Sequence, residues 1–352
     1  MKKILLLTFF FNALALHAQD VDFTSRLADE WEFLGPAVQH EGYDIWGSSP
    51  IKSEDGKIHI FVARWPDTIN VVPGWKTHSE IAHYVGNGPE GPFEFSDVAI
   101  TGTHANTWDK FGAHNPTIHK VGDQYVLLYI ANDGLEHMPW NQRIGMATSK
   151  SLYGPWEKVG RDGMILQPPA NPKYWNYNPG NGVNNPAFLQ HPGGGFFLYF
   201  KSQNKENRVS TMGLAFAEQL KGPYIQLPFP ITRNESIIED GYAFYSEGKF
   251  HIITTDNHGM IERGGGLIWS SNDGINFEAP KKAFHLIKDY LPEGELPKNL
   301  SFHYGGTVGK FERPQVLMEN GRPAYLYAPS GTNIYGGNGT ISYVLKRKST
   351  DK

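Results

Sequence analysis

The sequence predicts an all-β protein, a five-bladed β-propeller with four-stranded antiparallel blades. The first observation is a phrase that recurs along the chain: a Pro- or Gly-containing turn, a strand, a Gly-containing hairpin and an aromatic-rich strand. The second is an interleaved phrase of a strand, a polar turn and a strand opened by an aromatic residue. Third, 39 glycines and 24 prolines supply many turns, and no periodic run of helical length follows the N-terminus. Two strands from each phrase make one blade.

The N-terminus reads as a secretory signal peptide over residues 1–18. Met1-Lys2-Lys3 is followed by an apolar run and then by small residues, with cleavage expected near Ala18 or Gln19. The apolar run is too short to span a bilayer, and the chain has no cysteine for a disulfide or a lipid anchor. We therefore expect a periplasmic or secreted protein, with residues 19–352 forming a single propeller that is the catalytic domain.

The first phrase is anchored at positions 50, 116, 186, 241 and 314, where a Pro or Gly is expected to open the innermost strand of each blade. Its strands are expected at 58–62, 117–120, 125–129, 187–190, 196–200, 249–253, 315–318 and 324–327.

The second phrase supplies the outer half of four blades. Its strands are expected at 80–85, 143–147, 212–216 and 266–269, and the strands after them are opened by Phe93, Trp156, Tyr224 and Phe277. The segment 31–34 is expected to pair with 339–345, so that N- and C-terminal strands close the ring. One or two β-sandwiches would also show short strands, but they give no reason for two phrases to alternate.

The loops at the propeller axis are where chemistry is expected. If the innermost strands begin near the axis, the side chains just before each anchor converge there, and several of them are acids or amides. Such a set suits hydroxyl-rich ligands and proton transfer. The converging residues are Ser48, Ser49, His114, Asn115, Asn184, Asn185, Glu239, Asp240, Glu312 and Arg313.

With these features the chain resembles the propeller glycoside hydrolase superfamily that includes families 43, 32, 62, 68, 117 and 130. The phrases 143–156 and 270–277 are similar to turns common in these enzymes. The resemblance implies two carboxylates across the sugar and a third acid that orients it. In the commoner pattern the acids open the first, third and fourth blades. Glu239 matches the fourth, whereas Ser48-Ser49 and Asn184-Asn185 stand at the other two.

The catalytic candidates follow from this pattern. For the proton donor we expect Glu239, then His303 or Glu312, and the resemblance to family 117 also allows a histidine, His114 or His303, in that role. Other acids must supply the base. The candidates for it are Asp44, Glu80 and Asp256.

Substrate, partners and cofactors complete the expectation. We expect an oligosaccharide or polysaccharide substrate, and two arginines in the cleft hint at an anionic sugar. A net charge of -4 without a Lys/Arg cluster argues against nucleic acid and anionic membranes. No cofactor or metal is predicted, a monomer or small homo-oligomer is expected, and calcium on the axis stays open. The expected substrate-binding residues are His114, Asn115, Asn185, Asp240, Arg313, Arg143 and Trp46.

Two alternatives remain from the residues alone. The first is a polysaccharide lyase, in which His114, His303 or Tyr304 would move protons and Arg143 or Arg313 would neutralise a uronate. The second is a non-catalytic carbohydrate-binding propeller that has lost the missing carboxylates.

Overall fold

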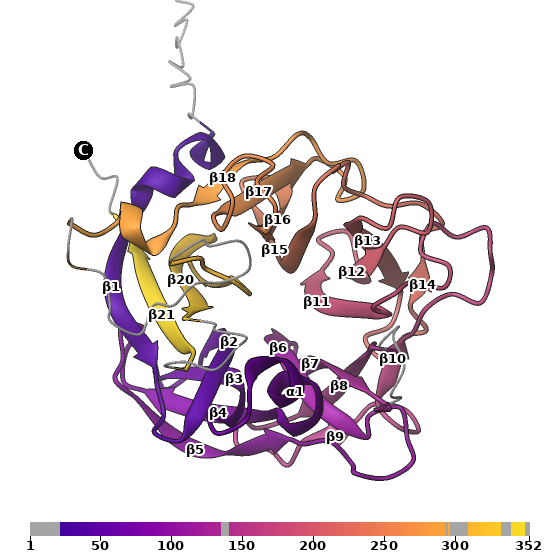
Figure 1. The fold of residues 1–352 in the computed structure, drawn as a ribbon, viewed down its shortest axis with the longest axis horizontal. Helices are drawn as coiled ribbons and strands as arrows, with labels where there is room; N and C mark the ends of the chain where they lie inside the picture. The colour runs from indigo at the N-terminus through magenta and orange to yellow at the C-terminus, as the bar shows by residue number, and fades with distance from the viewer. Residues whose placement is uncertain (1–21, 135–140, 293–294, 296–308, 332–338, 349–352) are drawn as a thin grey trace, which may run out of the picture.

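The computed structural model describes residues 22–134, 141–292, 295, 309–331 and 339–348. Five antiparallel sheets are arranged around a central axis as the blades of a propeller (Figure 1). This confirms the predicted fold class. His303, Tyr304 and the segment 1–18, for which a signal peptide is expected, lie outside the described residues.

Each blade runs from an inner strand at the axis to an outer strand at the rim. Blade I is β2 (Tyr43–Lys52), β3 (Ile58–Pro66), β4 (Glu80–Gly86) and β5 (Phe93–Ile100). Blade II is β6 (Phe111–Val121), β7 (Gln124–Asn132), β8 (Arg143–Ser149) and β10 (Met164–Leu166), with β9 (Glu157–Lys158) also paired to β8. Blade III is β11 (Val183–Gln190), β12 (Phe196–Gln203), β13 (Ser210–Ala217) and β14 (Ile225–Gln226).

The last two blades follow the same plan. Blade IV is β15 (Ile238–Ser246), β16 (Lys249–Asp256), β17 (Gly266–Ser271) and β18 (Lys281–Phe284). Blade V is β19 (Gln315–Glu319), β20 (Arg322–Ser330), β21 (Ile341–Arg347) and β1 (Trp31–Val38). The short helical turns are η1 (Phe23–Ser25), η2 (Leu27–Glu30), α1 (Val71–Pro73), the π-turn η3 (Gly74–His78) and η4 (Ile287–Asp289).

The ring is closed by the two ends of the chain, as the sequence predicted. β1 pairs antiparallel with β21, in a register that places Trp31 opposite Arg347. The Trp31 side chain is 1% exposed, and its indole N–H donates to the carbonyl of Ala283 on β18 at 2.9 Å. The first strand therefore joins blade V to blade IV.

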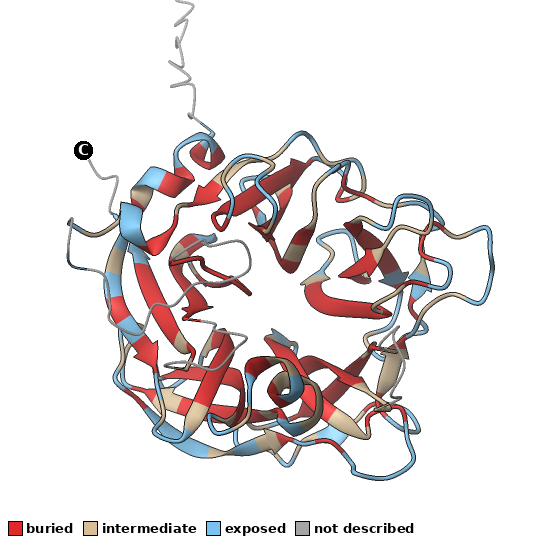
Figure 2. Cartoon of the chain, in the orientation of Figure 1, coloured by how far each residue is buried: buried red, intermediate tan, exposed pale blue. Residues whose placement is uncertain are grey.

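Apolar side chains fill the spaces between neighbouring blades, and exposed residues concentrate at the rim (Figure 2). The cluster between blades II and III contains Leu128 and Phe188, and the cluster between blades IV and V contains Ile268 and Leu326. The inner strands of the sheets are covered on both faces and are almost continuously buried, which positions them firmly around the axis.

One detail of the prediction is wrong in blades I to III: Pro50, Pro116 and Pro186 lie inside the inner strands and do not open them, whereas Pro314 directly precedes β19 as expected. In β6 and β11 the proline lies within an irregularity of the register, Pro116 between His114 and Thr117 and Pro186 between Asn184 and Ala187. Proline tolerates such a position because a bulge removes the need for its missing N–H. The outer strand of blade IV also differs, since it begins at Lys281 and not at Phe277. Among the described residues, no helix is both long and apolar enough to cross a membrane.

Candidate active site

The inner strands share a backbone irregularity close to the axis. In blades I to IV the pairing shifts register there, and in all five blades one residue adopts a left-handed conformation. Left-handed backbone is uncommon outside glycine and marks a position held by its surroundings. We name these five residues the axial ring: Gly47, Asn115, Asn185, Asp240 and Arg313.

The residues immediately before the axial ring form a second set, the flanking ring: Trp46, His114, Asn184, Glu239 and Glu312. In blade I the equivalent pair is therefore Trp46-Gly47. The expectation that Ser48 and Ser49 occupy this place is wrong. Both serines are buried, Ser48 donating to Ser342 at 2.6 Å and Ser49 accepting from the Ile118 N–H at 2.9 Å.

Hydrogen bonds link the axial ring from blade to blade. Asn115 Nδ2 donates to Asn185 Oδ1 at 2.7 Å, and Asn185 Nδ2 donates to Asp240 Oδ1 at 2.6 Å. The Arg313 backbone N–H completes the chain by donating to Asp240 Oδ2 at 3.3 Å. Asn115, Asn185 and Asp240 are each at most 5% exposed. Their observed contacts are with one another, whereas the sequence suggested contacts with substrate.

The side chain of Arg313 is fully buried on the axis. Its Nη2 donates to the carbonyls of Asn115 and Pro186, both at 3.1 Å, and its Nη1 donates to the carbonyl of Gly241 at 3.3 Å. Burial lowers its pKa to about 10, against the opposing charge of Asp240. The guanidinium thus binds backbone carbonyls of three blades, the oxygen ligands that calcium also uses.

Three carboxylates meet where blades IV and V approach the axis. Oxygens of Glu239, Asp240 and Glu312 all lie within 4.8 Å of one another. The alternation of a regular strand would send Glu239 and Asp240 to opposite faces, but the left-handed backbone at Asp240 breaks that alternation. Glu239 and Asp240 therefore lie close together although they are adjacent in the strand. Such a cluster could hold a cation, although lysines already neutralise part of it.

Two lysines and an amide complete the cluster, and sequence reasoning missed all three. Lys201 Nζ lies 2.7 Å from Glu239 Oε1, and Lys310 Nζ lies 2.7 Å from Glu312 Oε1. Asn257 accepts from Lys310 and also hydrogen-bonds Glu239. Lys201 did carry a signal, since it is the single charged residue of β12 and directly follows five apolar or aromatic residues. Lys310 and Asn257 stand in loops and carried none.

The pKa values of the three acids diverge. Burial would raise the pKa of Glu239, but the charge and hydrogen bond of Lys201, with help from Lys310 and Asn257, lower it. Burial and the neighbouring Glu239 raise the pKa of Asp240 to about 6, and burial raises that of Glu312. Glu239 is therefore ionised at neutral pH, which does not fit the proton donor that the sequence suggested.

Asp44 lies near the start of β2 in blade I, whereas Glu239 belongs to blade IV. Asp44 is 3% exposed, and its Oδ1 accepts from the Thr340 N–H of blade V at 2.7 Å. Burial raises its pKa to about 6 despite that hydrogen bond. Asp44 is thus a carboxyl group that carries its proton in mildly acidic solution.

Other predicted residues have partners elsewhere. Glu80 is bound by Arg64 at 2.9 Å on the third strand of blade I, and Arg143 lies 3.3 Å from Asp133. Asp256 is fully buried and accepts the backbone N–H groups of residues 259–262. None of these side chains is brought to the carboxylate cluster, so Glu80 and Asp256 are poorly placed to act as the base.

An aromatic group surrounds His114 on the blade I side of the axis. The rings of Trp46, Trp65 and Trp75 lie 6.5, 5.7 and 5.4 Å from the imidazole, between centroids. His114 Nδ1 lies 3.0 Å from Ser79 Oγ. Burial and the charge of Arg313 lower the pKa of His114 to about 3, so the ring is neutral and does not serve as a proton donor near neutral pH.

Comparison with solved structures gives the same fold. Over 92% of this chain and 91% of the other, it superposes with a TM-score of 0.67 and 16% identity on Zg3597, a family 117 glycoside hydrolase of the marine bacterium Zobellia galactanivorans. BT0996, solved as a complex with RGII, matches with a TM-score of 0.64, 13% identity and coverage of 91% and 94%. CoXyl43, a family 43 β-xylosidase/α-arabinofuranosidase from a compost metagenome, matches with a TM-score of 0.57 and 14% identity, over 90% of this chain and 93% of the other. No protein-family model and no curated protein matches the chain.

Proposed function

We propose that this protein is a secreted glycoside hydrolase that cleaves glycosidic bonds in plant or algal oligosaccharides or polysaccharides. The observation that carries the proposal is the position of Glu239 in the flanking ring, 2.7 Å from Lys201 and clustered with Asp240 and Glu312. The fold likeness to glycoside hydrolases supports it.

The spacing of the acids suggests which two carboxyl groups work as a pair. In glycoside hydrolases the two carboxyl groups stand about 5–5.5 Å apart when configuration is retained and about 6.5–9.5 Å apart when it is inverted. One oxygen each of Glu312 and Asp240 lies within 4.8 Å of a Glu239 oxygen, which is below both spacings. We therefore assign the second carboxyl group to Asp44, on another blade.

The pKa values divide the roles between the two acids. Glu239, whose pKa is lowered, acts as the base that activates water or as the carboxylate that attacks the sugar. Asp44, whose pKa is raised to about 6, donates the proton to the leaving oxygen. This reverses the roles suggested by the sequence. His303 stays a prediction as an alternative donor.

The lyase alternative loses support from the same contacts. It needs a cation beside the uronate, and Arg313 and Arg143 were its candidates. Arg313 is committed to backbone carbonyls and Arg143 to Asp133.

The first test is incubation of the purified mature protein with a panel of plant and algal oligosaccharides, with products identified by mass spectrometry. Products that together have gained one water indicate hydrolysis. Products formed without water would support a lyase, and an oligosaccharide that binds but stays intact would support a binding protein. Sequencing of the secreted protein's N-terminus checks cleavage near Ala18.

Two variants test the roles. Glu239→Gln should lower kcat at least about a hundredfold, whereas Glu235→Gln, at an exposed position on the same segment, should leave it unchanged. Asp44→Asn should lose much more activity on a natural glycoside than on an activated aryl glycoside, whose leaving group needs no protonation. Equal losses on both substrates would contradict Asp44 as the donor.

A further inference from the structure

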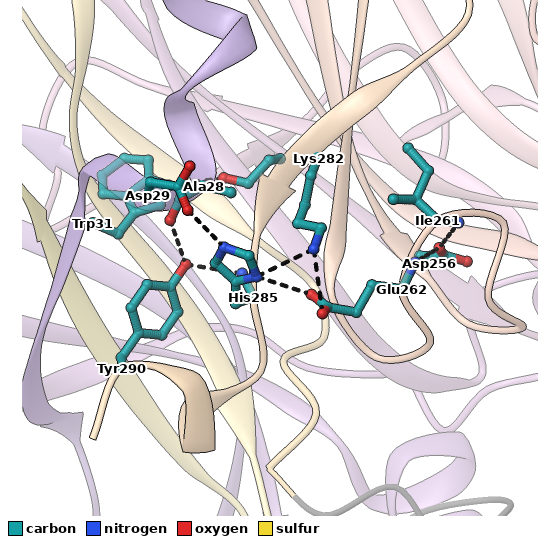
Figure 3. A network of polar contacts seen from close by, with 10 residues as sticks. Ala28, Asp29, Trp31, Asp256, Ile261, Glu262, Lys282, His285 and Tyr290 are labelled. Carbon is teal, nitrogen blue, oxygen red and sulfur yellow. Dashed lines mark hydrogen bonds and ion pairs between the residues drawn. The ribbon is translucent and has the colours of Figure 1, made fainter. Parts of the chain in front are cut away.

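A second group of side chains that could bind a metal lies where blade IV meets the first described segment of the chain. Figure 3 shows two of its members, Glu262 and His285, together with Asp29. Glu262 comes from the loop between β16 and β17, His285 directly follows β18, and Asp289 ends η4. One ligand atom of each lies within 4.8 Å of the others. They are partly or fully exposed, so an ion from solution can reach them.

The surrounding contacts hold Glu262 in place. All four consecutive N–H groups of the loop 259–262 donate to the buried Asp256 carboxylate, at 2.7–2.9 Å. The loop that carries Glu262 is therefore fixed before any ligand binds, which lowers the ordering cost of binding.

His285 is held just as firmly. Tyr290 accepts the His285 backbone N–H at 2.8 Å and donates to the carbonyl of Ala28 at 3.0 Å. On the imidazole itself, Nε2 lies 3.1 Å from Asp29 Oδ1, while Nδ1 lies 3.2 Å from Glu262 Oε2.

The placement of Asp29 is the second observation that points to a metal. A carboxylate that accepts the proton of one ring nitrogen fixes the tautomer and leaves the other nitrogen as a lone-pair donor, the usual outer contact of a metal-bound histidine. In the tautomer in which Asp29 accepts Nε2–H, the lone pair of Nδ1 is directed toward the Glu262 carboxylate and the Lys282 ammonium, so a metal ion that displaced Lys282 would bind both groups.

We propose that Glu262, His285 and Asp289 bind a divalent transition-metal ion of the Zn²⁺ class, with Asp29 as the outer carboxylate. One nitrogen and two carboxylate oxygens suit zinc or its neighbours, whereas calcium and magnesium prefer oxygen alone. Three protein ligands leave at least one position for water.

Lys282 competes with this ion for two of its ligands, Glu262 and His285. Its Nζ lies 3.3 Å from Glu262 Oε1 and 3.4 Å from His285 Nδ1. The Lys282 side chain is 30% exposed, so it can swing into solvent when the metal enters. Its removal should therefore strengthen metal binding.

The ion would tie blade IV to the segment that leads into the ring-closing strand β1. Asp29 belongs to η2, directly before β1, and it reaches the metal through His285. Binding should then stabilise the closed ring, because a ligand that binds only the folded state raises its stability.

The experiment is calorimetric titration of the EDTA-treated, tag-free mature protein with ZnCl2, MgCl2 and CaCl2, followed by thermal unfolding with each ion. We expect one Zn²⁺ per chain, no comparable Mg²⁺ or Ca²⁺ binding, and a Tm raised by about 5 °C at a hundredfold excess over Kd. His285→Gln and Glu262→Gln should each weaken binding at least about tenfold, and Lys282→Met should tighten it. His191→Gln, at a distant blade III hairpin, is the control.

Zinc binding unaffected by His285→Gln and Glu262→Gln would overturn the proposal, as would absence of binding in both wild type and Lys282→Met. Circular dichroism confirms that each variant is folded. Co²⁺ gives a second readout, since its visible absorption should change on binding in wild type and not in His285→Gln.

Discussion

Replacement of Arg313 by methionine tests whether the axis is held by a guanidinium. The side chain is 0% exposed, and its two terminal nitrogens reach carbonyls of blades II, III and IV. Hydrogen bonds to a charged group contribute about 1.5–3 kcal/mol each, and removing one partner from a buried charged network costs about 3–5 kcal/mol. Methionine fills similar space but leaves these carbonyls unpaired. We therefore expect Arg313→Met to lower the free energy of unfolding by about 4 kcal/mol.

The measurement is urea unfolding followed by tryptophan fluorescence, with refolding checked, and calorimetry for the melting temperature. A loss of about 4 kcal/mol corresponds to a Tm lowered by about 8 °C. Arg322→Met is the matched control, because Arg322 is 49% exposed and pairs with Glu247 at the surface, where about 1 kcal/mol at most is expected. If Arg313→Met unfolds within about 1 kcal/mol of wild type, the guanidinium does not hold the axis.

Three further predictions concern charge, pH and ring closure. Lys201→Met should raise the pKa of Glu239, so the rise of kcat/KM with pH should move to higher pH. An unchanged pH profile of kcat/KM would show that Lys201 does not tune the catalytic carboxylate. Burial lowers the pKa of His59 to about 4. The contribution of neutral His59 to the free energy of unfolding is therefore complete above pH 6.5 and falls as the pH drops toward 4. Over this pH range, the urea midpoint of His59→Asn should fall less than that of the wild type. Trp31→Ala should cost about 4 kcal/mol in unfolding free energy, and an undiminished midpoint would show that β1 is dispensable.

The sequence was sufficient for the fold because the signals were local and repeated. Each blade carries its own alternation of apolar strands and turns, so an error in one copy is corrected by the others. The closing strand was predictable for a related reason. The segment 31–34 and the last predicted strand, 339–345, each lack another predicted partner. Pairing them is the simplest way to bury both in one blade.

The site was less predictable because it depends on where strand regularity fails. A regular strand sends successive side chains to opposite faces, and that rule separated Glu239 from Asp240. In blade I the proline at position 50 was taken as the anchor, which shifted the alignment onto Ser48 and Ser49. The left-handed residue is instead Gly47, where an added Cβ would lie 3.1 Å from Arg313 Cγ. Only the packed ring shows that glycine is needed there.

The missing carboxylates of blades I and III gain a physical meaning from the same geometry. In blade III the flanking and axial positions hold Asn184 and Asn185, and in blade I they hold Trp46 and Gly47. Asn185 donates to Asp240 through its amide, which a carboxylate in its place could not do without a shared proton. A second acid in the axial ring would also add charge beside Asp240, whose pKa is already raised by burial and by Glu239. The amides at this level therefore fit an axis filled by Arg313, and they agree with the proposed acid-base pair of Glu239, in the flanking ring, and Asp44, outside both rings.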